Sequence, residues 1–411
     1  MRNCVVMVLA GGQGARIFPL SRDRAKPAIP FGGKYRIIDF VLNNFVNSGF
    51  YQIYVLTQFK SQSLNKHIMQ GWRMSTHLGH FVSLVPAQMR TGTAWYRGTA
   101  DAIYQNMNLL DDNPHAEHVI VFGGDHIYKM EMNQFLDFHI EKNADLTVCV
   151  IPVDVKLANQ FGVVEVDKDW RIIGFQEKPE KPKTIPGNDK LALASMGNYA
   201  FTKDMITREL LSGGKEERPE YDFGKHTIPQ MIKRCNVFAY DFSKNTHRGM
   251  SENERGYWRD VGTLDSYWEA NIDLVSVSPQ FNLYNPQWPL LTNYPIYPPA
   301  KFVFNQKDDE KKRIGHAVDS LISSGCIISG GHVIRSILSP GVRVNSYSHI
   351  EESVVMEKVD IGRNCKIRKA IIDKEVTIPE GTTIGYNSEE DRKRFFVTPS
   401  GITVIPKKQS L

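Results

Sequence analysis

The chain has 411 residues, which is enough for two or three domains with large cores. Hydrophobic residues make up 41% and charged residues 23%, close to the averages of globular proteins, so disorder, collagen-like repeats and a coiled coil are excluded for the chain as a whole. The formal net charge of +5 is spread over a long chain. This argues against a nucleic-acid partner and is compatible with anionic small molecules.

Neither a membrane segment nor a disulfide framework is expected. No stretch approaches the roughly eighteen apolar residues of a membrane span. The five cysteines are scattered without a CxxC pair, which favours reduced thiols over a zinc site. The apolar run at the N-terminus leads into Gly11-Gly12 instead of a signal-cleavage pattern. We therefore expect a soluble, cytoplasmic protein with no membrane partner.

Up to about residue 275, short apolar runs alternate with longer amphipathic stretches. The runs are rich in Val and Ile and predict buried strands at Val5–Ala10, Gln52–Thr57, His118–Phe122 and Leu146–Pro152. Helical spacing is found at Ile37–Ser48, Ser61–Met69, Thr99–Leu110 and Met132–Lys142. This alternation predicts an α/β fold with a Rossmann-like, mostly parallel sheet. In such sheets, ligands bind beyond the carboxyl ends of the strands.

The second part of the chain has a different period. Residues 276–319 are predicted to be a linker, because their first part is rich in proline and a charged run follows at 307–313. From 320 to 411, aliphatic residues recur at steps of about six, with a wider gap after Ile350, at Val344, Ile350, Ile361, Ile367, Ile372, Ile378 and Ile384. This period is typical of a parallel β-helix, and an evenly spaced β-sandwich is the alternative.

The first predicted strand leads into a glycine-rich loop, Gly11-Gly12-Gln13-Gly14-Ala15-Arg16. Its backbone amides can approach an anion, and Arg16, Arg24 and Lys26 add positive charge nearby. The loop is not a P-loop, because no Gly-Lys-Ser/Thr follows, and Ile17 stands where the dinucleotide pattern requires glycine. A triphosphate site is one interpretation, and a tight strand–helix turn beside a basic face is the other.

Longer motifs carry a resemblance to a known family. They include Arg-Ala-Lys-Pro-Ala at 24–28, Trp-Tyr-Arg-Gly-Thr-Ala-Asp at 95–101, Gly-Asp-His-Ile-Tyr-Lys at 124–129, Glu-Lys-Pro at 177–179 and Tyr-Trp-Arg-Asp-Val-Gly at 257–262. With these motifs the chain resembles the bacterial glucose-1-phosphate adenylyltransferases over nearly its whole length. The resemblance implies a nucleotidyltransferase domain at 1–275, then the linker, and a left-handed β-helix of hexapeptide repeats at 320–411. It also implies that ATP and α-D-glucose 1-phosphate react to ADP-glucose and pyrophosphate for glycogen synthesis.

The same resemblance gives each candidate site residue a role. Asp125, which lies shortly after a predicted strand, and Asp260 would bind Mg²⁺, and a helix N-cap is the alternative for each. Arg16 and Lys26 would hold the triphosphate and the leaving pyrophosphate, and Lys178 would hold the sugar phosphate. Further contacts with glucose 1-phosphate would come from Tyr96, Gly162, Glu177 and Ser195. Nucleotide contacts would come from Leu9, Ala10, Gly11, Gly12 and Gly14.

Regulation and assembly are implied by the resemblance alone. Family members are commonly homotetramers and are controlled by anionic metabolites, which Arg24, Arg36 and Lys393 could bind here. Asp23 stands where many relatives carry a cation, so the identity of the effector stays open. Three other functions are compatible with parts of the pattern. They are a sibling pyrophosphorylase for another nucleotide, a non-catalytic regulatory subunit of this family, and a hexapeptide acyltransferase.

Overall fold

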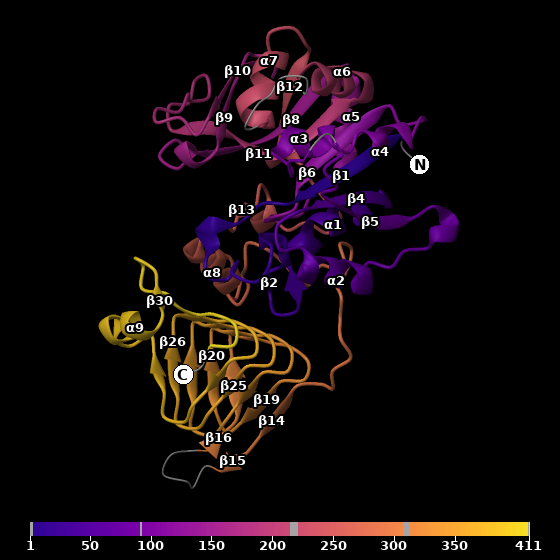
Figure 1. Ribbon diagram of the computed structural model, residues 1–411. Coiled ribbons are helices and arrows are strands. Elements are labelled where there is room, and N and C mark those ends of the chain that lie inside the picture. The colour runs from indigo at the N-terminus through magenta and orange to yellow at the C-terminus, as the bar shows by residue number, and fades with distance from the viewer. Residues whose placement is uncertain (1–2, 91–92, 214–220, 307–312, 410) are drawn as a thin grey trace.

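The computed structural model describes residues 3–90, 93–213, 221–306, 313–409 and 411. Two domains lie one above the other, and an extended segment after helix α8 (Leu264–Asp273) joins them (Figure 1). No helix in these described ranges has the length and apolar character that crossing a membrane requires. All five cysteines lie in the described residues and none forms a disulfide; Cys4 is half-buried and the other four are buried.

The upper domain is built on a mixed sheet of nine strands in the described residues. Seven of them lie in the order β10 (Ile172–Glu177), β9 (Gly162–Val166), β11 (Leu191–Thr202), β6 (His118–Gly123), β1 (Cys4–Ala10), β4 (Gln52–Thr57) and β5 (Phe81–Pro86). In addition, β8 (Leu146–Asp154) pairs with β11, and β12 (Val237–Asp241) pairs with β8. The four predicted strands are present. Strands β6, β1, β4 and β5 run parallel, so their carboxyl ends meet at one edge. The long strand β11 runs antiparallel to β6, β8 and β9.

Helices cover both faces of this sheet. One face packs against α1 (Ile37–Asn47), α2 (Gln62–Gly71) and α5 (Met132–Glu141), and the other against α3 (Thr99–Tyr104), α4 (Asn108–Asp111), α6 (Lys203–Gly213) and α7 (Ile228–Met231). The single helix expected at 99–110 is divided into α3 and α4. The amide of Asn106 donates to the Ala102 carbonyl (2.7 Å) and so competes with the helical backbone bond at that point.

The lower domain is a left-handed parallel β-helix with three sheets in the described residues. The first has β14 (Lys301–Val303), β19 (Ile327–Ser329), β22 (Arg343–Val344), β25 (Asp360–Ile361) and β28 (Thr377–Ile378). The second has β17 (His316–Val318), β20 (His332–Ile334), β23 (His349–Glu351), β26 (Lys366–Arg368) and β29 (Thr383–Ile384). The third has β18 (Leu321–Ile322), β21 (Ile337–Leu338), β24 (Val354–Val355), β27 (Ala370–Ile372), β31 (Thr403–Ile405) and β30 (Phe396–Val397). Helix α9 (Ser388–Arg394) interrupts the last coil.

The register of these strands explains the aliphatic period. Val344 pairs with Ile361 on the next coil, and Ile350 pairs with Ile367. Val355 fills the wide gap in the predicted column and pairs with Ile372. All six side chains are fully buried inside the coils. The column is therefore the core of the β-helix, which confirms this part of the fold.

The β-helix begins earlier than the sequence pattern indicated. Strand β14 pairs in parallel with β19, and β17 pairs in parallel with β20. Strands β14 and β17 both lie inside the expected linker 276–319. A small hairpin of β15 (Asn305–Gln306) and β16 (Arg313–Ile314) separates them and interrupts the period, so the first coil has no regular repeat in the sequence. Most of the charged run, residues 307–312, lies outside the described residues.

The third sheet of the β-helix packs directly on the upper domain. Ile337, Val354 and Ile371 share one buried cluster with Phe31 and Tyr267 of the upper domain. The ring of Tyr267 belongs to α8, which begins shortly after strand β13 (Trp258–Asp260). The contact is therefore apolar and continuous with the core that supports the candidate site.

One ion pair crosses this interface in a fully buried position. The Arg24 guanidinium donates to both carboxylate oxygens of Asp373, at 2.8 and 2.6 Å, and the two side chains are only 4% and 2% exposed. We expect Asp373→Ala to lower the free energy of unfolding by about 3–5 kcal/mol, because it leaves a buried charge without a partner. Urea denaturation of the full chain measures this loss.

A surface ion pair provides the control for that prediction. Arg22 and Asp23 approach to 3.3 Å but are half-exposed, so Asp23→Ala should cost less than about 1 kcal/mol. The double variant Arg24→Met/Asp373→Leu should recover most of the stability, since no buried charge remains. Equal stability of Asp373→Ala and the wild type would contradict a structural role for the pair.

Candidate active site

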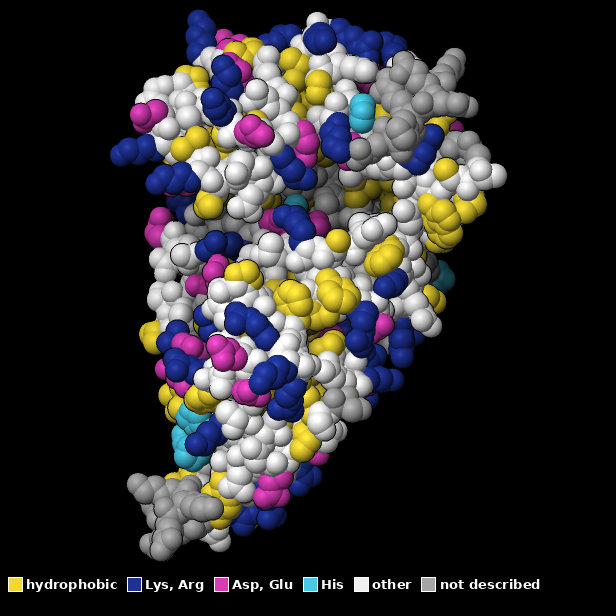
Figure 2. Space-filling model, turned by 60° about the vertical axis from the view of Figure 1, so that its left-hand side comes forward, with side chains coloured by type: hydrophobic (Ala, Val, Ile, Leu, Met, Phe, Trp, Pro, Cys, Tyr) yellow, Lys and Arg dark blue, Asp and Glu magenta, His cyan; other side chains and the backbone are white. Residues whose placement is uncertain are grey.

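A cleft of about 830 Å³ opens at the carboxyl ends of β1, β4 and β6. The view in Figure 2 shows a hollow in this face of the molecule where acidic, basic and histidine side chains gather. The twelve residues that were expected to hold substrates or a nucleotide, and the metal candidate Asp125, line it: Leu9, Ala10, Gly11, Gly12, Gly14, Arg16, Lys26, Tyr96, Asp125, Gly162, Glu177, Lys178 and Ser195. The metal candidate Asp260 lies beside them, bonded to Lys26.

The glycine loop presents backbone rather than side chains to the cleft. A methyl group on Gly12 would meet no atom within 4 Å, so its peptide faces open space. Gly14 has φ +62°, a left-handed conformation that favours glycine, and a methyl group there would lie 3.2 Å from the Cβ of Lys26. A short 3₁₀ turn, Ala15–Ile17, follows and carries Arg16. The loop therefore has the shape of an anion cradle.

Three charged side chains converge at the floor of the cleft. The Nζ atom of Lys26 lies 2.9 Å from Oδ2 of Asp125 and 2.8 Å from Oδ1 of Asp260. Arg16 approaches Asp260 at 3.4 Å. The two carboxylates lie at strands that pair with each other. Asp125 directly precedes β7 (His126–Tyr128), and Asp260 is the last residue of β13.

The charges of this group stabilise one another. Burial alone would raise the pKa of Asp125, but the charges of Lys26 and His126 outweigh burial, and the pKa lies below its ordinary value. The pKa of Asp260 is lowered for the same reasons. Burial alone would lower the pKa of Lys26, and the two carboxylates raise it instead. At neutral pH the site therefore holds two ionised carboxylates around one ammonium group.

These carboxylates fit a Mg²⁺ site. They already converge on a single cationic atom, the Lys26 Nζ, at hydrogen-bond distance. Mg²⁺ is usually held by one or two carboxylates together with substrate phosphates. A methyl group on Gly262 would lie 2.8 Å from Oδ1 of Asp260, so the backbone leaves no spare room behind this carboxylate.

The opposite wall of the cleft carries the residues expected to hold the sugar phosphate. Lys178 directly follows β10 in a left-handed conformation with φ 47°, and its side chain is 61% exposed. Its Nζ lies 3.4 Å from Oε1 of Glu177, which is the last residue of β10. A methyl group on Gly162 would lie 2.5 Å from the Phe175 ring and 3.1 Å from Oε2 of Glu177. Glycine at this position keeps the wall open around Glu177.

Ser195 and Tyr96 are held by irregular backbone. Strand β11 changes register between Ser195 and Tyr199, and the backbone amide of Gly197 donates to the Ser195 hydroxyl (3.3 Å). The Tyr96 backbone amide donates to the side chain of Gln58 (2.7 Å), and the Asn106 side chain donates to the Tyr96 hydroxyl (2.8 Å). Both side chains thus reach the cleft from irregular segments. A regular strand or helix at these positions would direct the side chains away from the cleft.

The cleft also has lining residues to which no sequence motif assigned a role. Gln58 follows β4 directly, so the rule on carboxyl ends of strands could have found it. Asp222 accepts from the Thr99 hydroxyl (2.7 Å) and caps the turn after it, and both residues line the cleft. His126 and Trp258 complete the floor. Only the tertiary structure brings these last four residues to the cleft.

The three candidates for an effector site lie elsewhere, and none of them lines the cleft. Arg24 is buried at the domain interface, and Arg36 donates to the hydroxyl and carbonyl of Ser63 (2.8 and 3.0 Å). Lys393 is exposed on α9 and pairs with Glu390 (2.6 Å).

A second ion pair lies beside the interface arginines. Lys374 bonds Glu357 at 2.7 Å, and both have Arg36 as an electrostatic neighbour. Burial, together with the neighbouring arginines, lowers the pKa of Lys374 to about 8 despite its carboxylate partner. The domain interface thus contains a cluster of cationic side chains, and acidic residues of the β-helix neutralise part of their charge.

Comparison with known families agrees with this architecture. The family model described as "Nucleotidyl transferase" matches residues 5–276, and the model "GlmU-like, C-terminal hexapeptide" matches residues 298–405. The fold and the cleft thus define a nucleotidyltransferase with a C-terminal hexapeptide β-helix. Similar proteins named glucose-1-phosphate adenylyltransferase occur in Anaeromyxobacter sp. (strain Fw109-5), with 55% identity over 99% of this chain and 98% of the relative, and in Deinococcus radiodurans, with 51% over 98% and 97%.

A third relative with this name, from Thermus thermophilus, is 54% identical over 98% of this chain and 97% of its own length. The chain belongs to the glucose-1-phosphate adenylyltransferase family. This assignment favours the main interpretation of the motifs over a hexapeptide acyltransferase and over a sibling pyrophosphorylase for another nucleotide.

Proposed function

We propose that the protein is a glucose-1-phosphate adenylyltransferase, which converts ATP and α-D-glucose 1-phosphate to ADP-glucose and pyrophosphate for glycogen synthesis. One observation carries the proposal. A single cleft is lined by the glycine loop, by Arg16 and Lys26, by Asp125 and by Lys178. The relatives with about 50% identity bear the name of this activity.

The chemistry requires positioning and charge neutralisation rather than a protein nucleophile. A phosphate oxygen of the sugar phosphate attacks the α-phosphorus of ATP, and pyrophosphate leaves. The glycine loop and Arg16 hold the triphosphate, and Lys178 directs the attacking phosphate. Asp125 and Asp260 would hold Mg²⁺, which when bound neutralises phosphate charge. Lys26, whose ammonium group lies between the two carboxylates, would hold phosphate oxygens of the triphosphate and of the leaving pyrophosphate.

A non-catalytic regulatory subunit is the remaining alternative within the family. Such subunits tend to lose the charged residues of the site, whereas this chain keeps Arg16, Lys26, Asp125, Lys178 and Asp260. The test is pyrophosphate release by the purified protein with glucose 1-phosphate, Mg²⁺ and each of ATP, GTP, UTP and dTTP. We expect turnover with ATP. Absence of turnover with every nucleotide would refute catalysis, and preference for another base would refute the adenylyl specificity.

Control by an anionic metabolite is part of the proposal and is supported by the cationic interface around Arg24, Arg36 and Lys374. The negative charge of Asp23, next to Arg24 in the chain, opposes anion binding there. We expect weak activation of the wild type by sugar bisphosphates and stronger activation of Asp23→Lys. Initial rates against fructose 1,6-bisphosphate measure both, and strong activation of the wild type would contradict the prediction.

We also propose a cytoplasmic homotetramer. Five cysteines without a disulfide fit a reducing compartment. Exposed apolar side chains such as Val277, Tyr284 and Ile296 lie on the segment between the domains and offer a surface for association. Sedimentation equilibrium determines the number of subunits, and a monomer at all concentrations would contradict the proposal.

A further inference from the structure

The two carboxylates expected to share a metal depend on a very short sheet. Asp125 directly precedes β7, and Asp260 is the last residue of β13. These strands pair through only three residue positions, with Asp260 opposite His126, and both lie outside the nine-stranded sheet. The distance between the carboxylates is therefore set by whatever holds β13 against β7.

Strand β7 has its own anchor in the core, and β13 has much less. Ile127 and Tyr128 of β7 are fully buried. In β13, Arg259 is exposed and its two neighbours are only half-buried, whereas Tyr257 and Val261, which flank the strand, are buried. The position of β13 consequently depends on contacts made by the chain segments that flank it.

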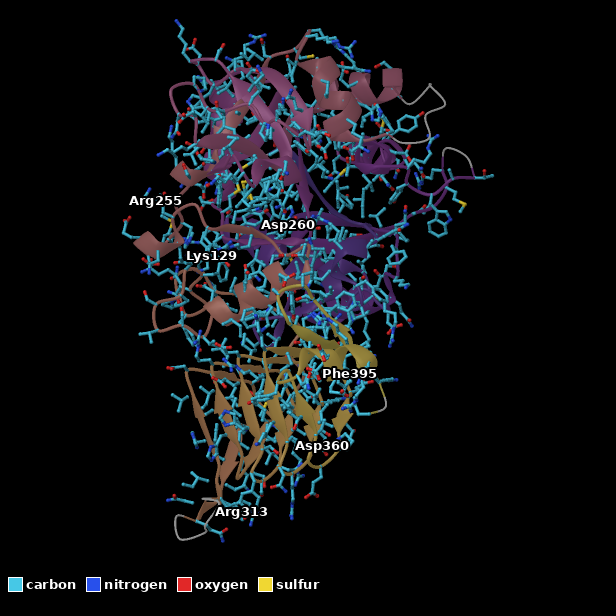
Figure 3. All side chains as sticks on the ribbon, turned by 90° about the vertical axis from the view of Figure 1, so that its left-hand side faces the viewer. Lys129, Arg255, Asp260, Arg313, Asp360 and Phe395 are labelled. Carbon is cyan, nitrogen blue, oxygen red and sulfur yellow. The ribbon has the colours of Figure 1, made fainter. Side chains whose placement is uncertain are left out.

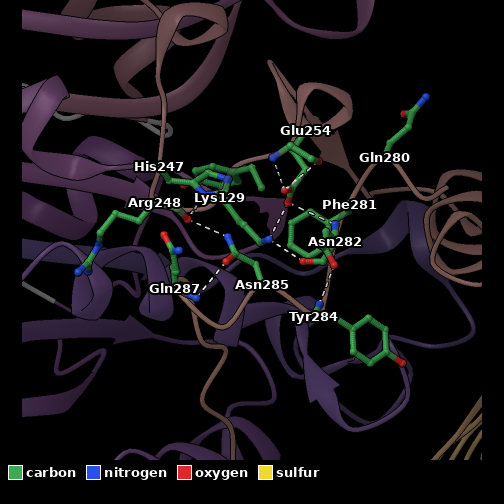
Figure 4. Close-up of polar contacts among 12 residues, drawn as sticks. Lys129, His247, Arg248, Glu254, Gln280, Phe281, Asn282, Tyr284, Asn285 and Gln287 are labelled. Atoms are coloured by element: carbon green, nitrogen blue, oxygen red, sulfur yellow. Dashed lines mark hydrogen bonds and ion pairs between the residues drawn. The ribbon is translucent and has the colours of Figure 1, made fainter.

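A buried ion pair supplies such a contact on the N-terminal side of β13. Lys129 directly follows β7, and its Nζ donates to Oε1 of Glu254 and to the Asn282 carbonyl, both at 2.6 Å (Figure 4). The Lys129 ammonium also lies 5.0 Å from the centre of the Phe281 ring. Both charged side chains are only 2% exposed. Figure 3 shows Lys129 and Asp260 in the same half of the catalytic domain, above the β-helix.

Glu254 is itself fully engaged. Its Oε2 accepts from the amide and the hydroxyl of Ser251, both at 3.2 Å, and its Oε1 accepts from the amide of Asn282 (3.2 Å). The pair thus joins the end of β7 to the turn that leads into β13 and to the segment after α8. Neither Lys129 nor Glu254 lines the cleft.

A buried ion pair contributes little net stability, because two charges lose their hydration, and its best-attested use is to fix the register of neighbouring elements. We propose that Lys129 and Glu254 are positioning residues that hold β13 against β7 and so set Asp125 and Asp260 at the separation that one divalent cation requires. This inference rests on the proposed metal role of the two aspartates. It assigns a function to the lysine that ends the Gly-Asp-His-Ile-Tyr-Lys motif.

The test measures metal binding directly in the full-length protein. Mn²⁺ serves as the probe, and the loss of the free-ion electron paramagnetic resonance signal in the presence of ATP gives its affinity. We expect Glu254→Gln and Lys129→Met to weaken Mn²⁺ binding about 10- to 100-fold, as loss of a supporting contact behind metal ligands commonly does. Amide hydrogen exchange at residues 258–260 should accelerate, and the KM for glucose 1-phosphate should change much less. Lys129→Arg should restore part of the affinity.

A matched control separates positioning from general stability. Glu209 is also a buried carboxylate with a cationic partner, Arg234 at 2.5 Å, but it does not line the cleft or contact β13. Glu209→Gln should lower the melting temperature yet leave Mn²⁺ affinity unchanged. Circular dichroism shows which variants fold, and if Lys129→Met does not, Glu254→Gln decides the matter alone.

Asp125→Asn distinguishes failure of this inference from failure of the metal role. If Asp125→Asn abolishes Mn²⁺ binding while Glu254→Gln binds like the wild type, the positioning role is wrong and the metal role stands. If Asp125→Asn binds Mn²⁺ like the wild type, the metal role is wrong and the inference falls with it.

Discussion

Asp125→Asn should lower kcat by about 100-fold or more, while the KM values for ATP and glucose 1-phosphate change much less. The amide keeps the shape of the side chain but removes a charge that matters most as negative charge moves toward pyrophosphate. The fold should survive, because the buried ammonium of Lys26 keeps its 2.8 Å contact with Asp260. Steady-state kinetics at saturating Mg²⁺ measure the effect.

A conservative change at a distant carboxylate is the control. Asp112 is exposed and follows helix α4 outside the cleft, so Asp112→Asn should behave like the wild type. Full activity of Asp125→Asn would remove this carboxylate from the mechanism. A loss that appeared only as a raised KM would assign it to ground-state binding instead.

Lys178→Ala should raise the KM for glucose 1-phosphate by about 10- to 100-fold, because one charge-assisted hydrogen bond contributes about 1.5–3 kcal/mol. The KM for ATP should stay nearly constant, since Lys178 lies across the cleft from the glycine loop, at the end of β10. The side chain is largely exposed and makes one long contact with Glu177, so its removal should not disturb the fold. Initial rates with each substrate varied in turn give both constants.

The control for this variant is a lysine on the same hairpin. Lys168 is exposed in the turn between β9 and β10, at the opposite end of the strands from Lys178. Lys168→Ala should leave both KM values unchanged. A Lys178→Ala enzyme with weakened ATP binding and a normal KM for the sugar phosphate would reverse the assigned roles.

Several parts of the protein are encoded by local sequence patterns. Strand β1 and the glycine loop after it, the carboxylate directly behind β6, and the buried aliphatic column of the β-helix all follow from neighbouring residues. The roles of Lys178 and Ser195 came from resemblance alone. Neither residue is distinguished by its local spacing from an ordinary surface residue.

The tertiary structure alone decided how distant segments meet. Lys26 bonds carboxylates that lie 99 and 234 residues further along the chain, and the residues that support them come from the turn at Glu254 and the segment at Asn282. The buried pair between Arg24 and Asp373 spans 349 residues and docks the two domains. Such contacts leave no period in the sequence, because they depend on the packing of whole elements rather than on the spacing of residues within one. The start of the β-helix at Lys301 was missed for a related reason, since an inserted hairpin interrupts the repeat of its first coil.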